Sequence, residues 1–201
     1  GGQRMTSLEK RMQFIVEADK LKSILRQSTL ICNREQREND AEHTWHLTLC
    51  AILLSDYVSS KEPMDVLRVL KMLIIHDMVE IEAGDTYCYD EVGYQDKEQR
   101  EREAATNLFS TLPKEQYDEF MALWEEFEEM DTVEAKYASA IDRLQPVLQI
   151  YYCDGNTWIE NSIDIERELK RNEVIKEIVP EVWAYVETLV EDATSKGWLK
   201  R

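Results

Sequence analysis

The chain has 201 residues, 43% of them hydrophobic, and no Pro-, Gly- or Ser-rich stretch interrupts it, so we expect one globular domain with a sizeable core. Its formal net charge of −17 argues against nucleic acid or an anionic membrane as a partner, because both call for surfaces rich in Lys and Arg. No apolar run approaches the ~20 residues of a membrane span. A phosphate-bearing ligand would therefore need a local positive centre, such as a metal ion or a well-placed arginine.

Apolar residues recur at spacings of three and four almost throughout, which predicts an all-α, single-domain bundle of about seven to nine helices. The first helix is expected over residues 7–26, with an apolar face that includes Leu8, Met12, Ile15 and Val16. A polar loop over residues 32–40 should follow it. The remaining helices are expected at residues 41–58, 63–81, 97–111, 114–129, 132–152, 163–178 and 180–196.

The polar stretch 84–94 predicts a loop, and long loops in compact domains are often functional. The acidic run from Glu125 to Glu134 is expected to be a solvated helix face, with Trp124 and Phe127 as its buried stripe. The four cysteines include no CxxC pair and no segment resembles a signal peptide, so we expect reduced thiols and a cytoplasmic protein. Residues 1–2 resemble a cleavage scar, which assigns the domain to residues 3–201.

The chain has only three histidines, and one of them stands beside a carboxylate at the end of an apolar stretch. His76 and Asp77 follow a run of Leu and Ile, where burying them is costly unless a partner is present. A divalent metal is an efficient partner for such a pair. If the helix continues, Glu80 lies one turn further on the same side and could orient water beside the ion.

The other two histidines lie on the helix predicted for residues 41–58. His43 is followed by apolar residues that predict a core-facing helix face: Trp45, Leu49, Ile52 and Leu53. His46 could ligate an ion together with His43. The interpretation we favour is that His46 is an ordinary half-buried histidine that packs or forms a hydrogen bond.

A further carboxylate, Asp142, stands within the apolar stretch 138–148. It could supply a metal ligand from a separate helix. Alternatively, it could form a salt bridge with Arg143 or Lys136. Pro146 has no N–H to bond the carbonyl of Asp142, so it should kink the helix at this turn.

This ordered set resembles the HD-domain superfamily of metal-dependent phosphohydrolases, in which a His precedes a His-Asp pair and a distant Asp follows. The chain looks most similar to the 5'-deoxynucleotidase branch, which includes the HD-domain-containing protein two family. The resemblance covers residues 21–152 and is carried by three segments: residues 37–45, residues 76–80 with Gly84-Asp85, and residues 140–144. It implies an HD-type helical domain with a metal-binding core over about 21–152, on which C-terminal helices at 163–196 pack.

The resemblance also implies roles for individual residues. A single divalent ion would have four protein ligands: His43, His76, Asp77 and Asp142. His46 has no counterpart among them. Glu80 and Asp85 would be catalytic, and Arg26 would hold the substrate phosphate, a task that Arg34 or Arg37 could share.

Two imidazoles and two carboxylates would leave a divalent ion nearly neutral, with open positions for water and a phosphate oxygen. A ligand set without thiolate permits Mn, Co, Fe, Ni, Zn or Mg. We therefore expect a phosphomonoesterase that hydrolyses nucleoside or deoxynucleoside 5'-monophosphates. The alternatives are another HD-type phosphohydrolase or phosphodiesterase with a different nucleotide substrate, and a non-catalytic sensor of metal or nucleotide. A homodimer is expected from the resemblance and from the aromatic C-terminal segment with Trp183, Tyr185 and Trp198.

Overall fold

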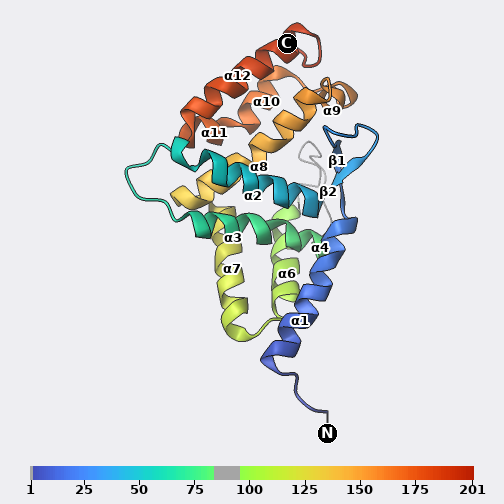
Figure 1. Ribbon diagram of the computed structural model, residues 1–201, viewed down its shortest axis with the longest axis vertical. Coiled ribbons are helices and arrows are strands. Elements are labelled where there is room, and N and C mark those ends of the chain that lie inside the picture. Colours follow the sequence, from blue (N-terminus) through green and yellow to red (C-terminus); the bar gives the residue numbers. More distant parts are fainter. Residues whose placement is uncertain (1, 84–95) are drawn as a thin grey trace.

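The computed structural model of the protein describes residues 2–83 and 96–201 (Figure 1). These residues are mostly helical, which confirms the all-α fold class, and they add one small antiparallel sheet that we did not expect. The loop predicted at residues 84–94 lies outside the described residues. The helices are α1 Ser7–Ala18, α2 Asp40–Leu54, α3 Val66–His76, α4 Glu80–Ala83, α6 Lys97–Phe109, α7 Lys114–Glu129, α8 Val133–Tyr152, α9 Asn156–Glu160, α10 Ile165–Arg171, α11 Glu173–Ile178 and α12 Pro180–Ser195.

The prediction of one helix over residues 7–26 is wrong in its second half. Helix α1 ends at Ala18, a 3-10 turn covers Asp19–Ser23, and strand β1 spans Leu25–Thr29. Strand β1 pairs with β2, Arg37–Asn39, because the intervening loop returns the chain to the start of α2. Such pairing depends on residues distant in sequence, which helical periodicity cannot reveal. Arg26 therefore lies on a strand.

The apolar face proposed for α1 is also wrong. Leu8, Met12, Ile15 and Val16 are all more than half exposed, whereas Phe14 on another face of the helix is buried. Helix α1 extends beyond the body of the bundle, so much of its surface meets no other element (Figure 1). Phe14 contacts Phe109 and Phe120 and provides the attachment of α1 to the core.

Helix α2 begins at a capping box. The Asn39 side chain accepts a hydrogen bond from the Glu42 N–H at 2.8 Å, and the Glu42 carboxylate accepts one from the Asn39 N–H at 2.9 Å. Because β2 runs directly into this cap, the side chains just before α2 are held close to its first turn. The helix buries Leu47 and Ala51 rather than the apolar residues that were expected to face the core.

Helix α8 is the central element, and α2, α3, α7, α11 and α12 all pack against it (Figure 1). Its small residues Ala135, Ala138 and Ala140 are buried, which allows neighbouring helices to approach closely. The helix continues through Pro146. Side chains along α8, Asp142 among them, thus face the surrounding helices.

The helix predicted for residues 163–178 is two helices, because the chain bends at Asn172 between α10 and α11. The buried Asn172 side chain donates hydrogen bonds to the Glu168 carbonyl at 2.7 Å and to its carboxylate at 3.1 Å. The apolar pattern continues through Asn172, so periodicity alone could not predict that one helix ends and another begins there. None of the helices in residues 2–83 and 96–201 combines the length and hydropathy that a membrane crossing requires.

Two glycines with positive φ provide a test of the C-terminal packing. At Gly155, φ is +70° and an added Cβ would lie 2.4 Å from Trp198 Cβ, whereas at Gly197, φ is +79° and nothing lies within 4 Å. Gly155→Ala should therefore lower the free energy of unfolding by about 3 kcal/mol, since it combines left-handed strain with overpacking. Gly197→Ala should cost about 1 kcal/mol of strain alone. Thermal melts check this, and equal effects for the two variants would contradict the packing described.

Candidate metal centre

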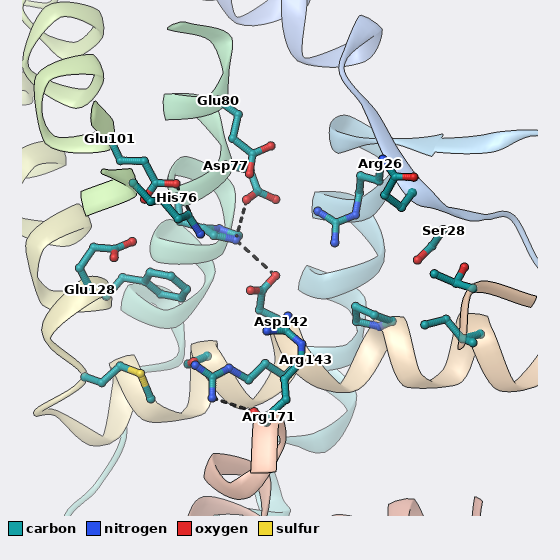
Figure 2. A pocket seen from close by; sticks show the side chains of 18 of the residues that line it. Arg26, Ser28, His76, Asp77, Glu80, Glu101, Glu128, Asp142, Arg143 and Arg171 are labelled. Atoms are coloured by element: carbon teal, nitrogen blue, oxygen red, sulfur yellow. Dashed lines mark hydrogen bonds and ion pairs between the residues drawn. The ribbon is translucent and has the colours of Figure 1, made fainter. Parts of the chain in front are cut away.

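Two imidazoles and two carboxylates from three helical segments converge beside a cavity, and His76, Asp77 and Asp142 of this group line it (Figure 2). Ligand atoms of His43, Asp77 and Asp142 all lie within 4.8 Å of one another. His76 joins them, because its Nε2 lies 3.1 Å from Asp77 Oδ1 and 3.4 Å from Asp142 Oδ1. Helix α2 supplies His43, the last residue of α3 is His76, the turn that follows begins with Asp77, and α8 supplies Asp142. The structure thus brings together all four residues that were expected to surround an ion.

Hydrogen bonds fix the orientation of both imidazole rings. His43 Nδ1 lies 2.8 Å from Gln145 Oε1, and His76 Nδ1 lies 2.8 Å from the Leu73 carbonyl oxygen. A carbonyl or amide oxygen can only accept, so each Nδ1 donates. Each Nε2 is therefore directed at the carboxylates, with the outer nitrogen anchored in the way usual for metal-binding histidines.

The charges of the cluster call for a cation at its centre. Burial lowers the pKa of His76, but the carboxylates of Asp77 and Asp142 outweigh this effect and raise the pKa well above its ordinary value. Conversely, burial raises the pKa of Asp142, but its hydrogen bond with His43 and the neighbouring His76 imidazole hold that pKa well below its ordinary value. Carboxylates that stay ionised in the interior need positive charge beside them.

A divalent ion fits these residues. His76 Nε2 and Asp77 Oδ2 are buried and, among the described residues, form no hydrogen bond. Both atoms point at the space between the carboxylates, where a metal bond would satisfy them. Two nitrogen and two carboxylate donors without thiolate suit first-row divalent metals. Mg²⁺ is also compatible, although it usually binds through fewer protein ligands.

The cavity beside the cluster has a volume of about 310 Å³, and Arg26 lies across it from His76 (Figure 2). The Arg26 side chain is 18% exposed. Burial lowers its pKa, but Asp77, Asp142, Asp40 and Glu80 together raise it above the ordinary value. Arg26 is thus a permanently charged guanidinium that faces the site, as predicted, although from a strand rather than from a helix end.

Of the two catalytic candidates, Glu80 lies within the described residues and Asp85 does not. Glu80 is the first residue of α4 and lines the cavity next to Asp77 (Figure 2). The expected continuous helix is interrupted here, because Asp77–Val79 form a 3-10 turn between α3 and α4. Asp85 lies outside the described residues, so its role stays a prediction.

The two alternative phosphate-binding arginines are engaged elsewhere. Arg34 is exposed and pairs with Asp154 at 2.6 Å, while also donating to the Tyr152 carbonyl. Arg37 donates to the Arg26 carbonyl at 2.6 Å, which ties the two strands together. Neither lines the cavity. Arg26 is therefore the best placed of the three arginines for the phosphate.

The structure also shows which contacts His46 and Asp142 make. His46 is half-buried, stacks on Trp45 and has its Nδ1 3.2 Å from Gln145 Nε2, as in the interpretation we favoured. Asp142 faces the two imidazoles. Lys136, one of its possible salt-bridge partners, instead pairs with Glu177 at 2.7 Å.

Several residues of the site were missed from sequence. Glu38, on β2, is 2% exposed and contacts both Arg26 and His43, and Gln145 holds His43 from one turn beyond Asp142. The spacing of Gln145 from Asp142 is a signal that could have found it. Glu128 is exposed, as expected, but it also lines the cavity. Further cavity-lining residues with charged side chains are Lys97, Glu101, Arg143, Glu168 and Arg171.

Comparisons with known proteins agree with this geometry. The HD-domain profile matches residues 18–183. The 5'-deoxynucleotidase HDDC2 of Bos taurus is 29% identical over 138 residues, which cover 69% of this chain and 65% of the relative. The chain thus spans just under two thirds of that relative's length. The 5'-deoxynucleotidase hdd1 of Schizosaccharomyces pombe is 28% identical over 92% of this chain and 85% of its own.

Solved structures share the fold. The crystal structure of a predicted metal-dependent phosphohydrolase from Magnetospirillum magnetotacticum superposes with a TM-score of 0.91 and is 44% identical, covering 97% of this chain and 96% of its own. The PH0347 protein from Pyrococcus horikoshii superposes with a TM-score of 0.65 at 26% identity, covering 89% of this chain and 99% of its own.

The cluster predicts the effect of removing one carboxylate. Asp142→Asn keeps the size of the side chain but withdraws the charge that faces both Nε2 atoms. After loading with Mn²⁺ and dialysis, the bound metal per chain should fall at least about tenfold, as measured by elemental mass spectrometry. Asp131→Asn, at an exposed carboxylate between α7 and α8, is the matched control. Metal retention equal to wild type in Asp142→Asn would show that the ion is bound elsewhere.

Proposed function

Because the chain belongs to the HD-domain family, we propose that it is a metal-dependent phosphomonoesterase that hydrolyses nucleoside or deoxynucleoside 5'-monophosphates to nucleoside and phosphate. The observation that carries this proposal is the convergence of His43, His76, Asp77 and Asp142 opposite the partly buried Arg26. The names of the curated relatives support the substrate class, since they are 5'-deoxynucleotidases. A cavity of about 310 Å³ is at the small end of ligand pockets and suits a mononucleotide.

The four converging side chains would hold one divalent ion, with Mn, Co, Fe, Ni, Zn and Mg all compatible with the donors. Such an ion supplies Lewis acidity toward the phosphoryl group and acidifies water that reaches it. His43 and His76 serve as ligands through Nε2 because their Nδ1 atoms are already engaged. Asp77 and Asp142 remain ionised there and neutralise the ion.

Arg26 binds the substrate phosphate in this proposal. The phosphate carries negative charge into a chain with a net charge of −17, so it needs a cation that stays charged in a partly buried position. The neighbouring carboxylates keep the Arg26 guanidinium protonated, and its planar donors match two phosphate oxygens. As the bond to the leaving oxygen breaks, the guanidinium stabilises charge on the phosphoryl oxygens.

Glu80 and Asp85 move protons in this proposal. The Glu80 carboxylate lines the cavity next to Asp77, where it can orient the attacking water and accept its proton. The leaving 5'-oxygen then needs a proton, which either carboxyl group can return. Nucleoside and inorganic phosphate are the products.

We further propose that the protein is cytoplasmic and forms a homodimer. Cys32, Cys50 and Cys153 are free thiols, in keeping with a reducing compartment. The aromatic C-terminal segment offers only part of its side chains to a second copy. Trp183 is buried and Trp198 packs beside Tyr151, whereas Tyr185 is exposed.

The surface of α2 and α3 is better suited to a second copy. Residues 43–55 contain no Asp, Glu, Lys or Arg, although 32% of the chain is charged. The α2 part of this surface, which has no charged residue, is where two chains of −17 can meet with least repulsion. Its exposed apolar side chains are Trp45, Leu49, Ile52, Leu53, Leu67 and Ile74.

The central prediction of this proposal is phosphate release. Protein loaded with Mn²⁺ or Co²⁺ should release phosphate from at least one member of a panel of ribo- and deoxyribonucleoside 5'-monophosphates, measured colorimetrically. Glu80→Ala should reduce turnover by at least about 100-fold and leave the metal content unchanged, because Glu80 acts on water rather than on the ion. The proposed activity is refuted if the metal-loaded wild type releases no phosphate from any member of the panel.

A charge introduced into the proposed dimer surface should separate the two chains. Light scattering should give wild type twice the chain mass of 23.7 kDa, and Ile52→Glu should return it to a single chain mass. Ile159→Glu, at a similarly exposed isoleucine on α9, should leave the dimer intact. A monomeric wild type, or a dimer unaffected by Ile52→Glu, would exclude this interface.

A further inference from the structure

The carboxylate of Glu38 lies between the two halves of the site. Its Oε1 is 3.4 Å from Arg26 Nε and 3.3 Å from His43 Nδ1. Glu38 thus contacts the guanidinium proposed to hold phosphate and the imidazole proposed to hold the ion. Its side chain is 2% exposed, so both contacts are made away from bulk water.

The other oxygen of Glu38 is anchored to α8. Glu38 Oε2 accepts hydrogen bonds from Gln145 Nε2 at 3.0 Å and from Gln149 Nε2 at 2.7 Å. These two glutamines lie one turn apart on the same face of the helix that carries Asp142. The short strand β2 is therefore tied through one side chain to the rigid central helix.

All four neighbours of this carboxylate present N–H groups. Arg26 Nε and both glutamine amides are donors, and His43 Nδ1 donates because it faces Gln145 Oε1. An ionised carboxylate, which only accepts, suits all four: Oε2 accepts hydrogen bonds from the two glutamines, and Oε1 faces Arg26 and His43 in ion-pair contacts. An amide in its place would direct its own N–H₂ at a donor in either orientation.

Charge balance in the site does not by itself account for the carboxylate of Glu38. The site already contains Asp77, Asp142 and Asp40, so another carboxylate adds repulsion to the cluster. Its effect is geometric. Glu38 holds Nε of Arg26 while Asp40 Oδ1 lies 3.6 Å from Nη1, and the guanidinium is directed into the cavity (Figure 2).

We propose that Glu38 is a positioning residue that sets Arg26 and His43 relative to each other, so that one carboxylate aligns the phosphate-binding group with the metal centre. This rests on the proposed function for the roles of Arg26 and His43. Glu38 does not touch the substrate. Through Arg26 it controls substrate affinity, and through His43 it controls metal affinity.

The test compares Glu38→Gln with Glu35→Gln, the same chemical change at an exposed glutamate three residues earlier. In Glu38→Gln, the KM for the best nucleotide should rise and the affinity for Mn²⁺ should fall, each about tenfold, as is typical for residues that orient metal ligands. Glu35→Gln should change neither. A purely structural glutamate would instead lower the melting temperature and the active fraction, with KM and Mn²⁺ affinity unchanged in the folded protein, and that outcome would overturn the proposal.

The double variant Glu38→Gln with Gln149→Glu separates position from charge. It exchanges the two partners of one hydrogen bond, so the network keeps one carboxylate and one amide in contact. The melting temperature should recover toward wild type, while KM stays raised because the carboxylate no longer faces Arg26 and His43. Recovery of KM together with stability would overturn the positioning role.

The two proposals fail in different ways. If metal-loaded wild type releases no phosphate from any nucleotide, the proposed function is wrong. Titration of Mn²⁺ into wild type and Glu38→Gln still tests the link to His43, because that measurement requires no turnover. Equal Mn²⁺ affinities and equal KM values in the two proteins would show that Glu38 positions neither group.

Discussion

Ionised carboxylates can be buried only beside compensating positive charge, and this chain buries several of them where α2, the end of α3 and α8 meet. Asp77 and Asp142 face the Nε2 atoms of two imidazoles, while Glu38 and Asp40 face Arg26. Without a cation, the carboxylates hold the histidine pKa values up and depend on protonated rings. A divalent ion would supply the same positive charge. The helices and strands around the site hold the side chains that would bind it.

The surrounding structure can be understood as the means of holding these charges. The capping box fixes the first turn of α2, and with it His43. Helix α8 places Asp142, Gln145 and Gln149 on successive turns. The same helix therefore supplies a candidate metal ligand and the two glutamines that orient His43 and Glu38. The two-stranded sheet brings Arg26 to the opposite wall of the cavity and Glu38 into contact with Arg26. An anionic substrate can thus enter a strongly acidic protein, because its phosphate would meet a guanidinium and an ion instead of the carboxylates.

Three residues of the candidate metal centre could be singled out from sequence because each is a polar residue in an otherwise apolar helical pattern. His76, Asp77 and Asp142 stand out for that reason, and their order supports a known arrangement. Arg26 was placed at the site but on the wrong element, since short strands form through pairing with distant residues. Glu38 was missed because it stands in a polar segment, where a buried glutamate cannot be distinguished from exposed ones. The apolar residues of α2 were misjudged for a related reason: a hydrophobic pattern alone does not show whether a helix face packs in the core or lies on the surface.

Occupation of the cluster by one ion is the central claim, and anomalous scattering from a crystal of the Mn²⁺-loaded protein tests it most directly. We expect a single anomalous peak about 2.0–2.3 Å from Nε2 of His43 and His76 and from a carboxylate oxygen of Asp77 and Asp142. A peak bound by other residues, or no peak in protein that retains stoichiometric Mn²⁺ in solution, would contradict the account.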